Sequence, residues 1–375
     1  MILSETQSAI RDAVRAFAQD RVKPRSFAFE AAKTYPAELF EELAALGLLG
    51  MTASEDDGGA GADMVSYALA LMEIAAADGA LSTILSIQNS LIVSGIIKDG
   101  TPAQKTRFLP DLISGRMIGA FALTEADAGS DAAAIRTRAT KVDGGYRLSG
   151  GKQFISSARI AGVAIVYAVT DPSAGKRGIS AFLVPTDTPG YVVDKVEHKM
   201  GQAASDTCAI RFDAMFVPDD LLLGVEGAGY GMALSNLEAG RIGIAAQCIG
   251  MAQAALDIAV AYAKDRKSFG KPIIDHQAVG FRLADLAARL EAARQLVLHA
   301  AAMKDAGLPC LKEASMAKLV ASETAEAVVS GAIQTLGGYG YLEEFGVAKI
   351  YRDVRVCQIY EGTSDIQRMV IARAL

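Results

Sequence analysis

The chain changes its hydrophobic periodicity twice, and this order constrains its fold more than any other feature. From residue 4 to about residue 115, apolar residues recur at three- and four-residue steps, which predicts helices. Short β-branched and aromatic stretches separated by Gly, Pro and Asp clusters follow, and they predict a compact β-domain. Helical spacing returns after the glycine-rich residues 224–231. This order predicts an α+β chain with segregated parts rather than an alternating βαβ fold.

We therefore predict three domains: residues 1–116, 117–226 and 227–375. Residues 64–98 are nearly apolar all round, which predicts helix buried in a bundle or at a subunit contact. The strands expected in the middle domain lie at residues 162–170, 179–184, 191–196 and 207–212.

Composition and charge exclude several classes of function. The net charge is -6 and no long basic run occurs, so nucleic acid is not an expected partner. The first residues lack a basic segment followed by an apolar core, and charge interrupts the later apolar runs. We therefore predict a soluble, cytoplasmic protein with no membrane partner. The four cysteines lack CxxC spacing and the three histidines form no ligand pair, so we expect buried, reduced thiols and no metal.

Two other strings come near known ligand motifs without matching them. Residues 227–231 approach the dinucleotide fingerprint, but Met232 occupies the last glycine position and a helical pattern surrounds it, so we interpret the string as a turn. Glu125, Asp127 and Asp131 lack the spacing of a calcium loop, and Arg136 stands where its closing glutamate is required.

Residues 352–368 carry the strongest functional signal. Glu361 lies at a junction between two predicted helices, and Gly362 permits close backbone approach to a ligand. Ser364 and Gln367 have the spacing of a capping box, which predicts a helix start with amides that favour an acceptor. In a water-poor pocket, desolvation would raise the pKa of Glu361 to a value useful for proton abstraction. The residues alone leave open a solvated carboxylate at a helix end.

Residues 352–368 resemble the C-terminal signature of the acyl-CoA dehydrogenase family, and residues 119–131 resemble its other signature. The two strings occur in the family's order, and looser similarity covers essentially the whole chain. The resemblance implies an N-terminal helical domain, a β-barrel-like middle domain and a C-terminal four-helix bundle. It also implies FAD, an acyl-CoA substrate, an electron-transfer flavoprotein as electron acceptor, and a homotetramer formed as a dimer of dimers.

The resemblance assigns residues of the middle domain to the flavin ring and diphosphate. Phe121, Leu123, Thr124, Gly129 and Ser130 are expected on one side of the flavin, and Phe154 and Ser156 on the other. Many relatives carry Trp and Thr at the last two positions, but Ser156 keeps a hydroxyl able to bond flavin N5.

The resemblance assigns a second set of residues to the pyrophosphate and adenosine, partly across a dimer contact. This set comprises Arg266, Ser268, Phe269, His276, Gln277, Gln334, Leu336, Gly337, Gly338, Thr363 and Asp365. A planar guanidinium such as that of Arg266 matches phosphate geometry. Relatives often carry Gln or Glu at the position of Asp365.

The resemblance further implies that Glu361 removes the pro-R α-proton while the β-hydrogen leaves as hydride to flavin N5. The Glu361 N–H and a ribityl hydroxyl are expected to bind the thioester oxygen. One subgroup of the family carries its catalytic glutamate at the position of Gly240, which leaves Glu361 the only matching base. Substrate contacts are expected from Ser130, Glu238, Arg241, Tyr360 and Gly362.

Residues 240–247 and 312–318 resemble the short-chain and short-branched-chain members. The expected substrate is therefore a short straight or 2-methyl-branched acyl-CoA, from fatty acid or branched-chain amino acid catabolism. Two alternatives stay open. One is a dehydrogenase or oxidase of carrier-protein-bound acyl thioesters, and the other is a non-catalytic binding or assembly protein on the same fold.

Overall fold

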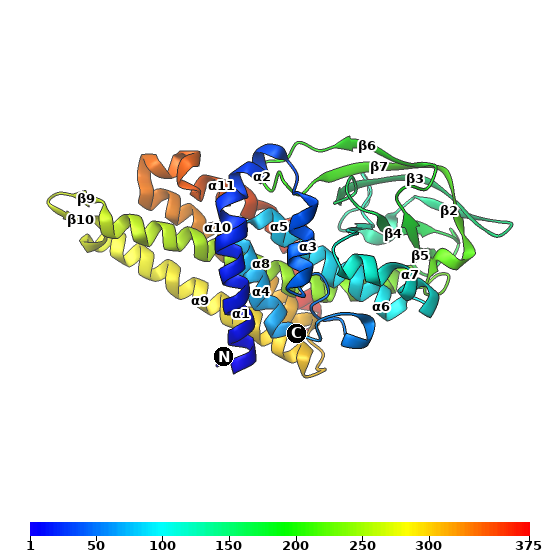
Figure 1. Cartoon of the computed structure of the whole chain (residues 1–375), viewed down its shortest axis with the longest axis horizontal. Coiled ribbons are helices and arrows are strands. Elements are labelled where there is room, and N and C mark those ends of the chain that lie inside the picture. Colours follow the sequence, from blue (N-terminus) through cyan, green and yellow to red (C-terminus); the bar gives the residue numbers. More distant parts are fainter.

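The computed structural model describes residues 1–375, in which a sheet region follows one helical region in the sequence and precedes another, and lies at one end of the molecule (Figure 1). The β-domain lies at the right of the view, and three long helices, α8, α9 and α10, extend to the left. The predicted α+β arrangement with segregated parts is confirmed.

The N-terminal region is helical throughout. Its helices are α1 (Glu5–Phe17), α2 (Ser26–Ala32), α3 (Ala37–Ala45), α4 (Met64–Ala77), α5 (Gly79–Ile87), α6 (Ser94–Asp99) and α7 (Pro102–Ile113). Two π-helical segments interrupt the regular helices: η1 (Ala18–Val22) follows α1, and η4 (Gln88–Val93) joins α5 to α6. Capping boxes begin α1 at Ser4 and α7 at Thr101.

Asp78 divides the apolar segment predicted over residues 64–98. Its backbone is extended (φ -156, ψ 114), and its side chain accepts the Leu81 N–H at the start of α5. Nearly every side chain of α4 and α5 is buried, so the prediction of a buried apolar segment is confirmed.

Two helical stretches are long and apolar enough to span a membrane, so the prediction that charge interrupts every such run was wrong. They are Gly79–Asp99 and Gly229–Asp265, with mean hydropathies of 1.6 and 1.5. Within the protein, 89% and 67% of their apolar windows are buried. Neighbouring helices of the same chain cover their apolar surfaces, as in the core of a folded domain.

The middle region forms one eight-stranded sheet. Its strands are β1 (Gly119–Ala122), β2 (Arg138–Val142), β3 (Gly145–Ser156), β4 (Val163–Val169), β5 (Ile179–Pro185), β6 (Tyr191–Val196), β7 (Thr207–Pro218) and β8 (Leu222–Leu223). The strand order is β6-β7-β3-β2-β4-β5-β8, and β1 pairs parallel to β4. Residues 163–168 of β4 are buried throughout, which places this strand at the centre of the β-domain core.

The C-terminal region contains α8 (Gly229–Asp265), α9 (Gln277–Asp305), α10 (Leu311–Leu336), α11 (Val347–Val354) and α12 (Ser364–Arg373), with a small hairpin of β9 (Lys267–Ser268) and β10 (Lys271–Pro272). Helix α8 packs against α10, α9 and α4. Fully buried alanines of α8, such as Ala245, Ala252 and Ala259, allow this close approach. One apolar core of 58 residues therefore joins the N-terminal helices to the C-terminal bundle.

Candidate active site

Glu361 lies in the turn between η11 (Arg355–Gln358) and α12. Both Glu361 (φ 51) and Gly362 (φ 89) adopt left-handed backbone conformations, which for glutamate is uncommon and strained. Lys318 Nζ on α10 donates to Gly362 O at 2.8 Å, and Gln367 Nε2 donates to the same oxygen at 2.9 Å. These contacts hold the turn in its strained conformation.

The prediction of a capping box formed by Ser364 and Gln367 was wrong: the helix begins with a different N-cap residue, and Gln367 bonds other groups. The N-cap of α12 is Thr363, whose hydroxyl accepts from Ile366 N at 3.3 Å. Gln367 instead donates to the carbonyls of Glu361 and Gly362, so it stabilises the turn rather than the first amide of the helix.

The Glu361 carboxylate faces α8 at Gly240. A Cβ atom at position 240 would clash with Glu361 Oε2, so the close approach requires glycine. The residue keeps some accessible surface, but Oε2 is shielded from solvent and has no hydrogen-bond partner. Desolvation raises the pKa of Glu361 to about 7, although Lys318 and Arg241 act in the opposite direction. The structure therefore favours a desolvated carboxylate over the solvated one that the sequence left open.

Arg241 and Tyr360 flank the acid. Arg241 is buried, and its Nε and Nη1 atoms have no partner. The Tyr360 hydroxyl donates to Gln247 Oε1 at 2.8 Å, and Gln247 Nε2 lies 2.6 Å from Thr83 Oγ1. These hydrogen bonds connect the residue next to the acid to α8 and α5.

The middle-domain residues assigned to the flavin meet at one end of β1 and β3. Gln153 N donates to Thr124 O at 2.9 Å, and buried Lys152 donates to Leu123 O at 3.0 Å and to Glu125 Oε1 at 2.7 Å. Glu125 Oε1 also accepts from the Thr137 amide at 3.0 Å, so its carboxylate connects the residues after β1 to Lys152 on β3 and to the residue before β2. These contacts hold the loop that follows β1 against β3.

The C-terminal part of β3 presents an open surface. The β3–β7 register shifts between Lys152 and Ile155, and Phe154 there has φ 60 and a ring that is 62% exposed. Ser156 pairs with Thr207 beyond this bulge, and the space around Gly129 is open. Phe121 and Ser130 belong to the same end, with the Phe121 ring 5.1 Å from Tyr167. An exposed ring beside a bulge fits a flat aromatic cofactor.

Most of the residues assigned to the pyrophosphate and adenosine lie in or beside the β9–β10 hairpin, which is at the left end of Figure 1. Arg266 lies 5.9 Å from the Tyr339 ring, which places the β9–β10 hairpin beside η9 (Gly337–Tyr341), which contains Gly337 and Gly338. Gln334 and Leu336 lie at the end of α10, immediately before η9. His276 Nε2 contacts Ser268 O at 3.0 Å, and the Phe269 ring is 94% exposed. Gln277 begins α9 next to them.

This hairpin group does not meet Glu361 within one chain. Arg241 and Arg266 are separated along α8 by about 37 Å at 1.5 Å per residue. Of the other assigned residues, Thr363 caps α12 beside the acid, whereas exposed Asp365 contacts Arg368 at 3.4 Å. Glu238 on α8 pairs with Lys304 at 3.0 Å.

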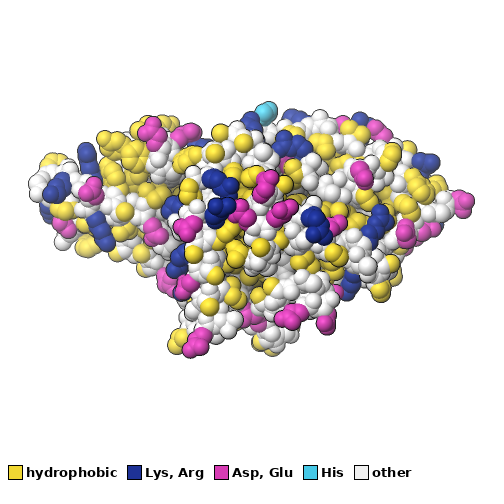
Figure 2. Space-filling model, viewed as in Figure 1, with side chains coloured by type: hydrophobic (Ala, Val, Ile, Leu, Met, Phe, Trp, Pro, Cys, Tyr) yellow, Lys and Arg dark blue, Asp and Glu magenta, His cyan; other side chains and the backbone are white.

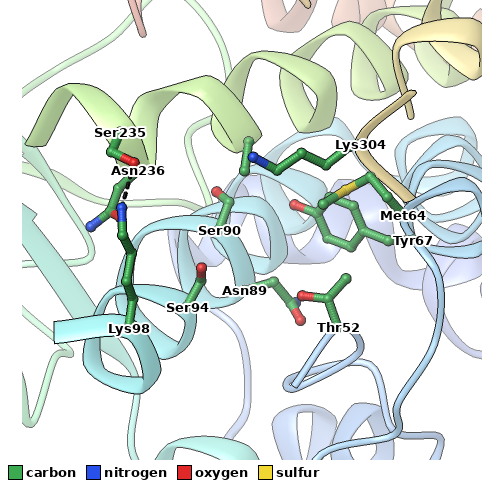
Figure 3. A pocket seen from close by; sticks show the side chains of 11 residues that line it. Thr52, Met64, Tyr67, Asn89, Ser90, Ser94, Lys98, Ser235, Asn236 and Lys304 are labelled. Atoms are coloured by element: carbon green, nitrogen blue, oxygen red, sulfur yellow. Dashed lines mark hydrogen bonds between the residues drawn. The ribbon is translucent and has the colours of Figure 1, made fainter. Parts of the chain in front are cut away.

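A cavity of about 210 Å³ lies between α4, η4, α6 and α8 (Figure 3). Polar side chains dominate its wall: Thr52, Tyr67, Asn89, Ser90, Ser94, Lys98, Ser235, Asn236 and Lys304, together with Met64 and Ala239. Ala239 immediately precedes Gly240 on α8 and Asn236 lies about one turn before it, so the cavity borders the acid's surroundings. The sequence analysis did not identify Tyr67 or Lys318 as site residues. The one pattern that could have indicated a polar cavity is the four-residue spacing of Ser86, Ser90 and Ser94.

Comparison with known proteins agrees with this geometry over the full length of the chain. Family models described as the N-terminal, middle and C-terminal domains of acyl-CoA dehydrogenase match residues 4–116, 120–215 and 227–375. The chain belongs to the acyl-CoA dehydrogenase family. Members of this family are FAD-dependent, and this acyl-CoA dehydrogenase is accordingly an FAD-dependent oxidoreductase.

Individual relatives match over nearly their whole length. The chain is 46% identical over 375 residues to an acyl-CoA dehydrogenase of Bacillus subtilis, covering 100% of this chain and 99% of the relative. It is 42% identical to butyryl-CoA dehydrogenase from Megasphaera elsdenii, with a TM-score of 0.97 and coverage of 100% and 99%. A solved structure described as the electron transferring flavoprotein of Acidaminococcus fermentans contains a chain 40% identical, with a TM-score of 0.98 and coverage of 100% and 98%.

Proposed function

We propose that this acyl-CoA dehydrogenase oxidises a short acyl-CoA to its trans-2-enoyl form, with Glu361 as the base that removes the α-proton. The observation that carries the proposal is the shielded, unpartnered Oε2 of Glu361. An unpaired buried oxygen is costly unless a ligand completes its surroundings. A pKa near 7 lets the carboxylate be ionised before the reaction and protonated after it.

The chain's own groups bind and activate the thioester. The Glu361 N–H donates to no acceptor within the protein, so it is available to the thioester oxygen as negative charge develops there. One such donor supplies about 2.7–4 kcal/mol of transition-state stabilisation. The positive charges of Lys318 and Arg241 stabilise the Glu361 carboxylate and keep its pKa from rising further.

FAD, when bound, supplies a hydride acceptor for the β-hydrogen. We assign the flavin ring to the surface formed by Phe121, Leu123, Thr124, Phe154 and Ser156. The nucleotide end is assigned to Arg266 and its hairpin neighbours, together with residues 334–338 and Thr363. Because the hairpin residues lie far from Glu361 in one chain, we assign them to the flavin site of a partner subunit, whereas Thr363 lies beside Glu361 of the same chain.

The proposed acyl group is short. Tyr360, next to the acid, is held by a continuous hydrogen-bonded group with Gln247 and Thr83. Similarity to butyryl-CoA dehydrogenase supports a four-carbon substrate. We keep a 2-methyl-branched acyl group as the second candidate, and fatty acid or branched-chain amino acid catabolism as the corresponding roles.

We further propose an electron-transfer flavoprotein as the electron acceptor and a homotetramer in the cytoplasm. The similarity to a chain from an electron transferring flavoprotein structure supports the acceptor. Exposed aromatic rings support the assembly: Phe269 at 94%, Tyr341 at 86% and Phe281 at 68%. Figure 2 shows hydrophobic patches over the left end of the molecule, where the β9–β10 hairpin lies in Figure 1. We place the domain boundaries near residues 116 and 226.

Anaerobic bleaching of the flavin tests the proposal. Purified holoenzyme is mixed with straight acyl-CoA substrates of increasing length, with 2-methylbutyryl-CoA, and with butyryl groups on a carrier protein. The proposal expects the fastest bleaching with butyryl-CoA and slow bleaching with long chains. Faster reaction with the carrier-bound group, or hydrogen peroxide as the main product in air, would contradict it. No bleaching with any thioester would support a non-catalytic protein.

A further inference from the structure

Three lysine side chains are buried in this protein, and one of them has no acid to pair with. Lys152 lies 2.7 Å from Glu125 and Lys349 lies 2.7 Å from Asp353, so both of these ammonium groups have a counter-charge. Lys318 is fully buried as well, but no carboxylate lies within 4.0 Å of its Nζ atom. Burying an ammonium without a counter-charge costs stability. Packing alone therefore does not account for a cation at this position.

The only hydrogen bond of the Lys318 ammonium goes to the turn that carries the acid. Its Nζ atom, on α10, donates to Gly362 O at 2.8 Å. The turn is strained, because Glu361 (φ 51) and Gly362 (φ 89) are both left-handed. The side-chain amide of Gln367 donates to the same oxygen at 2.9 Å, so a neutral group already satisfies this carbonyl. What Lys318 adds to the turn is a positive charge.

The charge of Lys318 acts on the acid. Glu361 Oε2 is shielded from solvent and has no hydrogen-bond partner, so water screens the interaction weakly. Burial raises the pKa of Glu361, and two groups oppose this rise: Lys318, with the larger effect, and Arg241. Burial lowers the pKa of Lys318 in turn, whereas the thiols of Cys248 and Cys357 and the nearby acid act to raise it. The ammonium therefore helps to determine the pH at which the acid becomes a base.

Four other titratable side chains surround the acid and the ammonium. Burial raises the pKa of Tyr67 on α4, of Cys248 on α8 and of Tyr360, so these three groups are neutral at physiological pH. Burial also acts to raise the pKa of Cys357, but its contacts with Cys248 and Tyr360 lower it overall. Cys357 is therefore the one further group whose ionisation has to be separated experimentally from that of the acid.

We propose that Lys318 is a positioning residue for the reaction: its ammonium fixes the Gly362 carbonyl of the strained turn and supplies the positive charge that keeps Glu361 ionised at neutral pH. The inference rests on the proposed role of Glu361 as the base. Only the carboxylate form removes a proton, so without this charge the enzyme would work over a higher pH range. The same cation lowers the stability of the fold, which separates its role from that of the ion-paired lysines.

Replacing the ammonium at nearly constant volume tests this role. Wild-type and Lys318→Met holoenzymes are mixed with sub-saturating butyryl-CoA from about pH 5.5 to about pH 9, and the second-order rate constant of flavin bleaching is recorded. In Lys318→Met the midpoint of the pH profile should rise by about one unit, and the rate constant on the acidic side should fall about tenfold. The melting temperature of this variant at about pH 6 should equal or exceed that of wild type, because a buried charge without a counter-charge is removed.

Matched variants separate the charge from the hydrogen bond and from packing. Lys318→Gln places a neutral amide at the same position, so its midpoint should rise as in Lys318→Met. Gln367→Leu removes the other donor to Gly362 O without changing any charge, so its midpoint should stay at the wild-type value. Cys357→Ala should also keep the wild-type midpoint. Lys349→Met removes an ion-paired ammonium, so its melting temperature should fall while its midpoint stays unchanged.

A wild-type midpoint in both Lys318 variants would overturn this inference alone, and so would an equal rise of the midpoint in Gln367→Leu or Cys357→Ala. A fall in the melting temperature of Lys318→Met as large as that of Lys349→Met would also overturn it, because the lysine would then be structural. A wild-type rate constant that does not change with pH, or no bleaching with any thioester, would instead overturn the proposed function.

Discussion

Two buried groups of charged side chains in this protein differ in how completely their polar atoms are paired. In the first, Lys349 lies 2.7 Å from Asp353 and 3.5 Å from Asp78, and every carboxylate oxygen of both acids has a partner. In the second, Glu361 and Arg241 leave Oε2, Nε and Nη1 without any. A fully satisfied network stabilises a fold, whereas unsatisfied groups mark a place completed by a ligand.

The paired group connects all three regions of the chain. Asp78 lies in the N-terminal region and also accepts from the Tyr35 hydroxyl at 2.7 Å, while Asp353 accepts from the amide of Gln202 in the β-domain. Burial lowers the pKa of Lys349, but the two carboxylates outweigh it and raise the pKa overall. Burial and the charge of Asp78 raise the pKa of Asp353, because one ammonium is shared between two acids. This group therefore has a structural role.

Glu361→Gln should produce the largest effect on catalysis. It removes the base at constant volume, so flavin reduction by butyryl-CoA should fall about 10³-fold or more. FAD content and acyl-CoA binding should be retained. Stopped-flow bleaching and equilibrium binding measure the two properties separately, and wild-type bleaching in this variant would place the base elsewhere.

The same variant should not lose stability. The folded-state pKa of Glu361 lies above its unfolded value, so ionisation of the buried acid lowers stability as pH rises from about 4.5 to about 7. Glu361→Gln should therefore melt at a higher temperature than wild type at pH 8, with little difference at pH 5.

Lys349→Met should show the opposite combination. Removing the ammonium leaves two buried carboxylates without a positive counter-charge, which typically lowers the free energy of unfolding by about 3–5 kcal/mol. Flavin reduction by the folded holoenzyme should fall far less than in Glu361→Gln, because Lys349 bonds Asp78 and Asp353 and not the acid. Lys141→Met is the matched control, since the Lys141–Asp219 pair is exposed and should contribute less than about 1 kcal/mol. Equal stability of the two variants by urea titration would remove the distinction between the two groups.

Gly240→Ala should have a smaller effect on the same reaction. The added methyl group meets Glu361 Oε2 and displaces the carboxylate, and a shift of this kind lowers the rate about 10²-fold. Gly231→Ala in the same helix meets no atom within 4 Å, so it should leave the rate unchanged and slightly increase stability. Equal rates in the two variants would show that the contact with α8 does not position the acid.

Local patterns in the sequence predicted the order of helices and strands, the buried apolar segments and the acid beside Gly362. They did not predict what depends on distant partners. Asp78 ends a helix because it is buried against Lys349, 271 residues away in sequence. Gln367 forms no capping box because its side chain donates instead to two carbonyls of the strained turn, those of Glu361 and Gly362. The facing of Gly240 and Glu361, and the cavity beside them, arise only when α8 packs between the N-terminal helices and α10.

The pH dependence of flavin reduction shows whether Glu361 acts as a desolvated base. Wild-type holoenzyme is mixed with sub-saturating butyryl-CoA from about pH 5.5 to about pH 9, and the second-order rate constant of bleaching, which reports ionisations of the free enzyme, is recorded. Lys318, Arg241 and Tyr67 face or surround the acid, and Glu361 is the group among them expected to titrate near neutrality. The account predicts a rate that rises through a single ionisation near pH 7 in the free enzyme. A constant rate over this range, as expected for a solvated carboxylate already ionised at pH 5.5, would contradict it.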